Sequence, residues 1–216
     1  MDQNRNLDAS LRRRGRPRHA EPSPEYRARL DEIVAVATEV FRQKGYEAGS
    51  LEDVAKELGL RKASLYYYFE SKSALLHLIF ERAIDDALQR IASIAMIEDP
   101  RERLEALIRH QAVRVASEPS LFTVFFDQRP SLNAVHYSEI LAKERAYVRA
   151  FADAAQSARN AGLLPDADPR TLADILLGMT NWSYKWFDPD RDDPEAFADI
   201  CVALIFSDVR DRTEDD

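Results

Sequence analysis

Residues 45–76 read GYEAGSLEDVAKELGLRKASLYYYFESKSALL and contain two short helical patterns that meet at a glycine. The first pattern opens at Ser50, whose hydroxyl can form a capping box with Asp53. Gly59 follows it and can adopt the positive φ that a tight turn between helices needs. The second pattern, residues 61–69, is apolar on one side and basic, hydroxylic and aromatic on the other. A short helix of this kind suits the DNA major groove, so the stretch predicts a helix-turn-helix.

The polar side of the second helix carries side chains that can donate hydrogen bonds to base edges and phosphates. They are Arg61, Lys62, Ser64, Tyr67 and Tyr68. The alternative interpretation is an ordinary corner between two helices of a bundle. A purely structural corner does not need a tyrosine cluster flanked by basic residues, which favours the DNA-binding interpretation.

The same stretch resembles the helix-turn-helix of the tetracycline-repressor (TetR/AcrR) family, over about residues 28–80. The match is carried by RKASLYYYF and by SKSALL at the start of the next helix. The resemblance implies that Ser50 and the amides behind it hold a phosphate, a chemistry that the helix dipole also favours. It further implies roles for six other side chains: Arg61, Lys62 and Ser64 at base edges, and Tyr67, Tyr68 and Lys72 on the DNA backbone, with Tyr66 half-packed.

The charge is distributed unevenly along the chain. Residues 1–72 carry a net charge of +2 and residues 73–216 carry −10, which total the −8 of the whole chain. Six arginines lie in the first eighteen residues, and Arg14, Arg16 and Arg18 stand in an RGRPR run that resembles an AT-hook. We expect these three to enter an A·T minor groove, the alternative being a solvated tail that adds only nonspecific attraction.

Helical periodicity and Asp-Pro pairs organise the remainder. Each pair places an N-cap acceptor before a proline, as at Asp99, Asp168 and Asp193. We predict an all-α fold of about nine helices, in which a three-helix DNA-binding domain is joined by a long fourth helix to a ligand-binding and dimerisation domain. The predicted divisions are a disordered basic arm (1–22), a helix-turn-helix domain (23–70) and a ligand-binding and dimerisation domain (71–216). Helices are expected at about 24–45, 51–58, 61–69, from 72 to beyond 91, 100–116, 121–126, 132–161, 169–187 and 194–209.

Several classes of protein and site are disfavoured by what the sequence contains. No apolar run reaches the ~18 residues of a membrane span, and no apolar stretch follows the arginine-rich start, so we expect a cytoplasmic protein without a membrane partner. Cys201 is expected to be a small apolar residue on a helix face. Residues 188–193 begin like a calcium loop but have an aspartate where the glycine belongs. The histidines are scattered without metal-ligand spacing, so no metal and no cofactor is predicted: they are His19, His77, His110 and His136.

Aromatic residues are concentrated in two segments of the second domain and predict an effector site there. The proposed ligand-binding residues are Phe122, Phe125, Phe126, Trp182, Lys185 and Trp186. An apolar slot with a cation beside it suits an amphipathic anion, and the segment 181–189 resembles family members that control lipid or steroid breakdown and respond to CoA thioesters. Arg145, Arg149 and Arg159 could meet the phosphates of such a ligand, or remain solvated. For most of the aromatic residues, a place in the core is the alternative.

The last two predicted helices have broad apolar faces, and in the family they form the dimer interface. The sequence therefore predicts a homodimeric, ligand-responsive transcriptional repressor whose partners are a palindromic double-stranded DNA operator and a small apolar effector, with an acyl-CoA as one candidate. The alternatives are an architectural protein that coats A·T-rich DNA and a helical-bundle enzyme. The enzyme is disfavoured because the sequence lacks a metal-binding Glu-x-x-His pair and a phosphate-binding glycine loop. We therefore predict no enzymatic activity and no catalytic residue.

Overall fold

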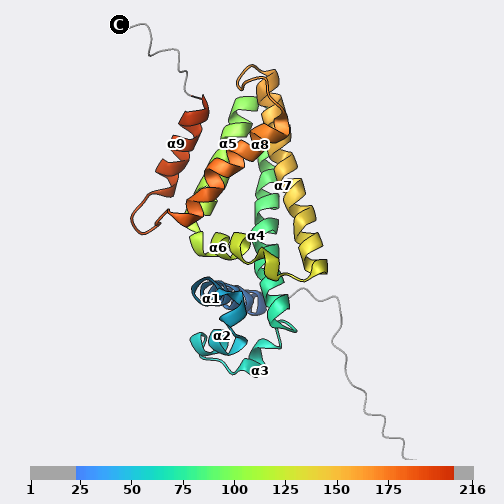
Figure 1. Ribbon diagram of the computed structural model, residues 1–216, viewed down its shortest axis with the longest axis vertical. Coiled ribbons are helices and arrows are strands. Elements are labelled where there is room, and N and C mark those ends of the chain that lie inside the picture. Colours follow the sequence, from blue (N-terminus) through green and yellow to red (C-terminus); the bar gives the residue numbers. More distant parts are fainter. Residues whose placement is uncertain (1–22, 207–216) are drawn as a thin grey trace, which may run out of the picture.

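The computed structural model describes residues 23–206, and within that range the chain forms nine α-helices, two 3₁₀ turns and no strand. This confirms the predicted all-α fold. In Figure 1 the first three helices form a group at one end, and α4 runs from this group into a larger bundle. The elements are α1 (Pro24–Ala48), α2 (Leu51–Glu57), α3 (Lys62–Leu65), α4 (Lys72–Ile94), α5 (Pro100–Ser117), α6 (Pro119–Asp127), η1 (Arg129–Ser131), α7 (Ala134–Asn160), α8 (Pro169–Asn181), η2 (Trp182–Lys185) and α9 (Pro194–Phe206).

Side-chain caps start the helices where the sequence places them. The Ser71 hydroxyl accepts a hydrogen bond from the Ala74 amide at 3.0 Å and opens α4. The carboxylates of Asp99 and Asp168 accept amide hydrogen bonds in the first turns of α5 and α8, each at 2.8–2.9 Å. Asp193 does the same at the start of α9, so the acidic loop before it ends in a helix cap, as predicted. These caps satisfy amides that have no partner inside the helix.

Three helix ends differ from the sequence-based prediction. The first helix continues through a kink at Gly45, where φ is 74°, and ends at Ala48. The third helix stops at Leu65 because the next amides bond three residues back, which turns the chain out of the α-helix. The eighth ends at Asn181 rather than at residue 187. There the Ser183 hydroxyl bonds to the Thr180 carbonyl and the chain tightens into η2.

The three N-terminal helices share one core. Ile33 and Phe41 of α1, Val54 of α2 and Leu65 of α3 are all fully buried. Burial of each such side chain contributes about 1.5–3 kcal/mol, so these few residues define how the helix-turn-helix packs. The core continues into α4 through Leu76, which is also fully buried.

The larger bundle is built from α4, α5, α7 and α8, with α9 beside α5 and α6 lying across the base next to α1 (Figure 1). Two hydrogen bonds join α6 and its C-terminal cap to the N-terminal group. The Ser120 hydroxyl donates to Glu39 at 3.1 Å, and the Tyr46 amide donates to the Gln128 side chain at 3.2 Å. The two parts of the molecule therefore touch through α6 as well as through α4. Within the described range, no helix is both long and apolar enough to cross a membrane.

Candidate DNA-binding surface and effector cavity

The turn between α2 and α3 has the predicted geometry. Gly59 adopts φ of 64°, the left-handed conformation that glycine tolerates best. The Ser50 hydroxyl accepts from the Asp53 amide at 3.2 Å, and the Ser50 amide donates to the Asp53 carboxylate at 2.9 Å, which completes the capping box. The Ser50 hydroxyl also donates to the Asp53 carboxylate at 2.6 Å. Hydrogen bonds from Lys44 and Ser50 hold the pKa of Asp53 well below its usual range. The capping network thus occupies the Ser50 hydroxyl, to which the sequence assigns a phosphate.

The exposed face of α3 presents most of the side chains that were predicted to reach DNA. Arg61, Lys62 and Ser64 are exposed, and Tyr67 is 60 % exposed. The Lys62 ammonium lies 3.7 Å from the Glu52 carboxylate, and both groups are in contact with solvent. An ion pair this exposed contributes little, so Lys62 can exchange Glu52 for a phosphate or a base edge at low cost.

Two tyrosines are placed differently from the prediction. Tyr68 is half-buried and packs on Tyr26 of α1, with ring centroids 5.0 Å apart. Tyr66, expected to be half-packed, is 50 % exposed. The reason is the early end of α3: after Leu65 the backbone leaves the 3.6-residue period on which the expected faces were based.

Lys72 contacts the protein itself. Its ammonium donates to the Glu47 carbonyl at 3.2 Å and lies 4.2 Å from the centroid of the Tyr46 ring. It nevertheless borders a recess of about 360 Å³ that also includes Ser50, Lys62 and Tyr66. Three residues assigned to DNA from the sequence therefore surround one hollow. Arg14, Arg16 and Arg18 lie outside the described residues.

A cavity of about 310 Å³ that is partly open to solvent lies between α4, α5, α6, α7 and α8. Phe122, Phe125 and Phe126 line it, as the sequence predicts for a ligand site. The rings of Phe125 and Phe126 meet edge to face with centroids 5.4 Å apart. Ala83 and Ala87 of α4 form part of the opposite wall, and their small side chains leave space.

A buried polar network forms another part of this wall. The Gln111 amide group donates to the Asn181 side chain at 2.5 Å and accepts from the Tyr147 hydroxyl. Burial raises the pKa of Tyr147, so the hydroxyl stays protonated and remains a donor. Such a network orients a polar group of a ligand inside an otherwise apolar site.

Four arginines and one carboxylate add charge to the wall: Arg114, Arg129, Arg145, Arg170 and Glu144. Arg129 pairs with Glu144, and Arg170 pairs with Asp174 at 3.0 Å. Arg145 is exposed, and no carboxylate within residues 23–206 forms an ion pair with it. Of the three arginines that the sequence offered for ligand phosphates, only Arg145 borders the cavity; Arg149 and Arg159 do not.

The tryptophans lie outside the cavity, contrary to the prediction. Trp182 is 62 % exposed and Trp186 is 53 % exposed, and the Lys185 ammonium pairs with Asp127 at 2.8 Å. Because the helix ends at Asn181, the two tryptophans are not one turn apart on a helix face. Tyr184 is the residue of this segment that packs on Phe126, with ring centroids 5.1 Å apart.

Four polar residues of the cavity were not predicted as ligand-binding residues from the sequence: Gln111, Arg114, Tyr147 and Asn181. Gln111 and Asn181 are 70 positions apart, so no local pattern joins them. A glutamine on the apolar stripe of α5 was the available signal, since a buried glutamine needs a partner.

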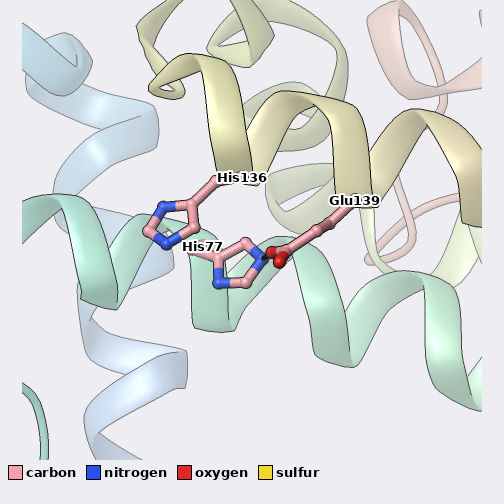
Figure 2. Close-up of side chains that lie close together, drawn as sticks. All are labelled: His77, His136 and Glu139. Carbon is pink, nitrogen blue, oxygen red and sulfur yellow. Dashed lines mark ion pairs between the residues drawn. The ribbon is translucent and has the colours of Figure 1, made fainter.

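Two histidines that the sequence shows as scattered are also brought together. His77 of α4 and His136 of α7 stack with ring centroids 3.8 Å apart, and Glu139 lies beside them (Figure 2). The spacing of residues along the sequence does not indicate this contact, because it joins two helices through residues 59 positions apart. His110 lies elsewhere on α5, and His19 lies outside the described residues.

An apolar strip on α8, η2 and α9 is exposed to solvent. Its members are Ile175, Trp182, Trp186, Ile200 and Leu204, each at least 53 % exposed. Cys201 of α9 is buried, and that burial raises the pKa of its thiol. The sequence predicts a small apolar residue on a helix face here, and in the structure it packs into the core.

A helix-turn-helix with an exposed basic and aromatic face, joined by a continuous helix to a cavity-bearing bundle, defines a class of DNA-binding regulator. Residues 33–79 match the bacterial regulatory proteins of the tetR family, and residues 98–209 match the tetracyclin repressor-like C-terminal domain. The chain belongs to this family, which the sequence resemblance had indicated.

Relatives extend the comparison. The negative transcriptional regulator IcaR of the Staphylococcus aureus biofilm operon icaADBC is 36 % identical over 67 residues, 31 % of this chain and 34 % of IcaR. The match thus spans about a third of the length of that relative. The transcriptional repressor KstR2 of Rhodococcus jostii is 26 % identical over 167 residues, 74 % of this chain and 80 % of KstR2. The crystal structure of AibR with isovaleryl coenzyme A and operator DNA is 30 % identical, has a TM-score of 0.75, and covers 82 % of this chain and 98 % of AibR.

Proposed function

We propose that this chain is a ligand-responsive transcriptional repressor, which binds a palindromic operator as a homodimer and leaves it when an acyl-CoA thioester enters the cavity. The observation that carries the proposal is the course of α4. This helix begins at Lys72 beside the recess under α3, and its residues Ala83 and Ala87 line the cavity. Because one continuous helix borders both places, a ligand that moves α4 also moves the DNA-binding end.

We assign DNA binding to residues 23–70 and to the basic arm of residues 1–22. Arg61, Lys62 and Ser64 face base edges, and Tyr67 contacts the backbone. Their exposure on one side of α3 supports this assignment. Arg14, Arg16 and Arg18 of the arm add contacts in the minor groove. Tyr68 acts indirectly, because its packing on Tyr26 fixes the position of its neighbour Tyr67.

We assign effector binding and dimerisation to residues 71–216. The exposed apolar side chains of the strip on α8, η2 and α9 support dimerisation, since each is at least 53 % exposed and a partner that covers them removes apolar surface from water. A dimer with two-fold symmetry brings the strips of both copies together and places two helix-turn-helix domains on one operator. Trp182 and Trp186 then belong to the interface rather than to the ligand site.

The chemistry of the cavity supports an acyl thioester as effector. The phenylalanine cluster accepts an apolar chain, and the amide groups of Gln111 and Asn181 can bind the thioester carbonyl. Arg145, exposed and without a carboxylate partner in residues 23–206, can bind a CoA phosphate outside. The AibR structure, which is 30 % identical to this chain, contains isovaleryl coenzyme A, an acyl thioester.

Release follows from a shift between two dimer conformations. The two helix-turn-helix domains of the dimer must lie about 34 Å apart to enter consecutive major grooves. A ligand that fills the cavity favours a conformation in which α4 is displaced and this spacing is lost. The shift can be no larger than the preference of the ligand for one conformation over the other.

Footprinting on selected genomic fragments tests the proposal. Fragments bound by the purified chain are recovered, sequenced and footprinted with and without acyl-CoA thioesters. A short symmetric footprint that disappears with a thioester is the expected result. Extended protection without symmetry, insensitive to thioesters, would instead identify an architectural A·T-coating protein and contradict the proposal.

A further inference from the structure

A cluster of two imidazoles and one carboxylate lies where α4 and α7 pack against each other. His77 comes from the second turn of α4, and His136 and Glu139 come from the first two turns of α7 (Figure 2). One potential ligand atom of each residue lies within 4.8 Å of the others. The cluster is separate from the effector cavity and from the exposed face of α3, and neither of these uses it.

The Nε2 atom of His77 is the feature that points to a ligand. It is buried and makes no hydrogen bond within the described residues, although Glu139 Oε2 lies 3.2 Å away. A buried polar atom without a partner is unfavourable, and a neutral imidazole beside a carboxylate leaves two electron-pair donors close together. A cation placed between them would satisfy both atoms.

A second carboxylate lies beside the other nitrogen of the His77 ring. Glu81 Oε2 is 3.8 Å from Nδ1 of His77, and Glu81 Oε1 accepts a hydrogen bond from Lys143 at 3.1 Å. Carboxylates next to imidazole ligands help to orient them in metal sites.

We propose that His77, His136 and Glu139 bind one divalent transition-metal ion of the Zn²⁺ type. Imidazole nitrogens suit Zn²⁺, Ni²⁺ and Cu²⁺, whereas Mg²⁺ and Ca²⁺ prefer all-oxygen sites. Three protein ligands with a water in the fourth position give the tetrahedral arrangement of an open zinc site, with bonds of about 2.0–2.1 Å to nitrogen.

Binding requires one adjustment. The two rings are stacked with their planes 3° apart, so their lone pairs point in parallel directions and do not meet. The imidazole of His136 must therefore rotate about its Cβ–Cγ bond. That turn breaks the 3.0 Å contact of its Nδ1 with the Asn133 side-chain amide, which also lies 3.5 Å from the Ser73 hydroxyl and can bond there instead. Glu139 is exposed and can follow the ion.

A metal ion at this position would affect the stability of the folded chain. His77 lies five residues after the start of α4, next to the DNA-binding end, and His136 lies near the start of α7. An ion bound by both would link the two helices at this joint and stabilise the folded chain. This consequence does not depend on the proposed repressor function.

Titration of the full chain with metal tests the site. After treatment with a chelator, the protein is titrated with Zn²⁺ by calorimetry, and thermal unfolding is followed with and without the ion. We expect one strong site per chain, a rise of several degrees in Tm, and no displacement by excess Mg²⁺ or Ca²⁺. Co²⁺ in place of Zn²⁺ should give the visible absorption of a tetrahedral centre.

Substitutions locate the ion. Glu139→Gln and His136→Gln both change side chains that are outside the core, so these variants are expected to fold, and each should weaken binding at least about tenfold. Glu81→Gln removes the carboxylate beside Nδ1 of His77 and its ion pair with Lys143, and it should weaken binding less than loss of a ligand does. Asp153→Asn, an exposed carboxylate further along α7, is the control and should bind as the unmodified chain does. Absence of a strong site, or a site unaffected by both ligand substitutions, would overturn the proposal.

Discussion

The rings of Phe80 and Phe125 stack with centroids 4.9 Å apart and planes 28° apart. Phe80 is a fully buried residue of α4, and Phe125 lines the effector cavity from α6. A displacement of Phe125 by a ligand therefore reaches α4 directly. Packed aromatic rings do not deform gradually, so the contact favours two discrete positions of the helix.

The exposed face of α3 provides the first prediction. Lys62→Ala and Tyr67→Ala should each weaken operator binding by about 1–3 kcal/mol, the range for a lost base or backbone contact. The Tm should change little, since both side chains are largely outside the core. Arg191→Ala, which removes an exposed cation in the loop before α9, is the charge-matched control for Lys62. Unchanged affinity in both variants would remove α3 from the DNA surface.

The apolar strip provides the second. Ile200→Glu and Leu204→Glu place a carboxylate on side chains that are 60 % and 68 % exposed in the monomer. If the strip is the dimer interface, each introduced carboxylate is buried against the second subunit, and the dissociation constant of the dimer should rise at least about tenfold. Light scattering across a dilution series measures this. Val135→Glu changes an equally exposed apolar residue on α7 and is expected to leave the dimer intact.

The buried polar network provides the third. Tyr147→Phe removes the hydroxyl that donates to Gln111 and leaves a buried acceptor unsatisfied, at a cost of about 1–3 kcal/mol. For a chain of this size that corresponds to a fall in Tm of roughly 2–4 °C per kcal/mol. Tyr137→Phe removes the same hydroxyl from an exposed position on the same helix and should have little effect. Equal Tm values for the two variants would mean that the network does not stabilise the fold.

His110 provides a prediction about how the stability of the fold changes at low pH. Burial, and then the positive charges of Arg114 and Arg90, lower its pKa from 6.5 to about 4. Because the folded-state value is the lower one, the unfolded chain takes up the proton first as the pH falls. The stabilisation from this group is therefore complete above about pH 6.5 and is lost as the pH falls toward 4. The Tm of His110→Gln should fall less than that of the unmodified chain between these values, and parallel curves would contradict the assignment.

Local chemistry made most of the fold predictable. Ser50, Ser71, Asp99 and Asp168 each start a helix with their own side chain, and a cap depends on only four residues of sequence. Gly59 likewise marks its turn because few other residues accept that φ. Arg61, Lys62 and Ser64 are exposed, as the pattern of residues 61–69 predicts.

The failures arise where the period breaks or where partners are distant in sequence. Trp182 and Trp186 were predicted to lie on one helix face. In the structure the Ser183 hydroxyl donates to the Thr180 carbonyl, and α8 ends at Asn181, before both tryptophans. Tyr68 was predicted to be exposed because the helix period was continued to residue 69, whereas α3 ends at Leu65. The Gln111 network and the stacking of His77 on His136 join different helices, and no spacing within one helix indicates such contacts.

The central claim is that a thioester in the cavity releases the operator. It is tested most directly by titrating a complex of the chain and labelled operator with acyl-CoA thioesters, and in parallel with the free acids and with CoA alone. We expect a thioester to dissociate the complex at concentrations where neither part does. Arg145→Gln should raise the concentration needed by about tenfold, the loss of one charge-assisted contact. Arg149→Gln changes an exposed arginine one turn further along α7, away from the cavity wall, and should have no effect. A complex that resists every thioester, or that CoA alone dissociates equally well, would contradict the account.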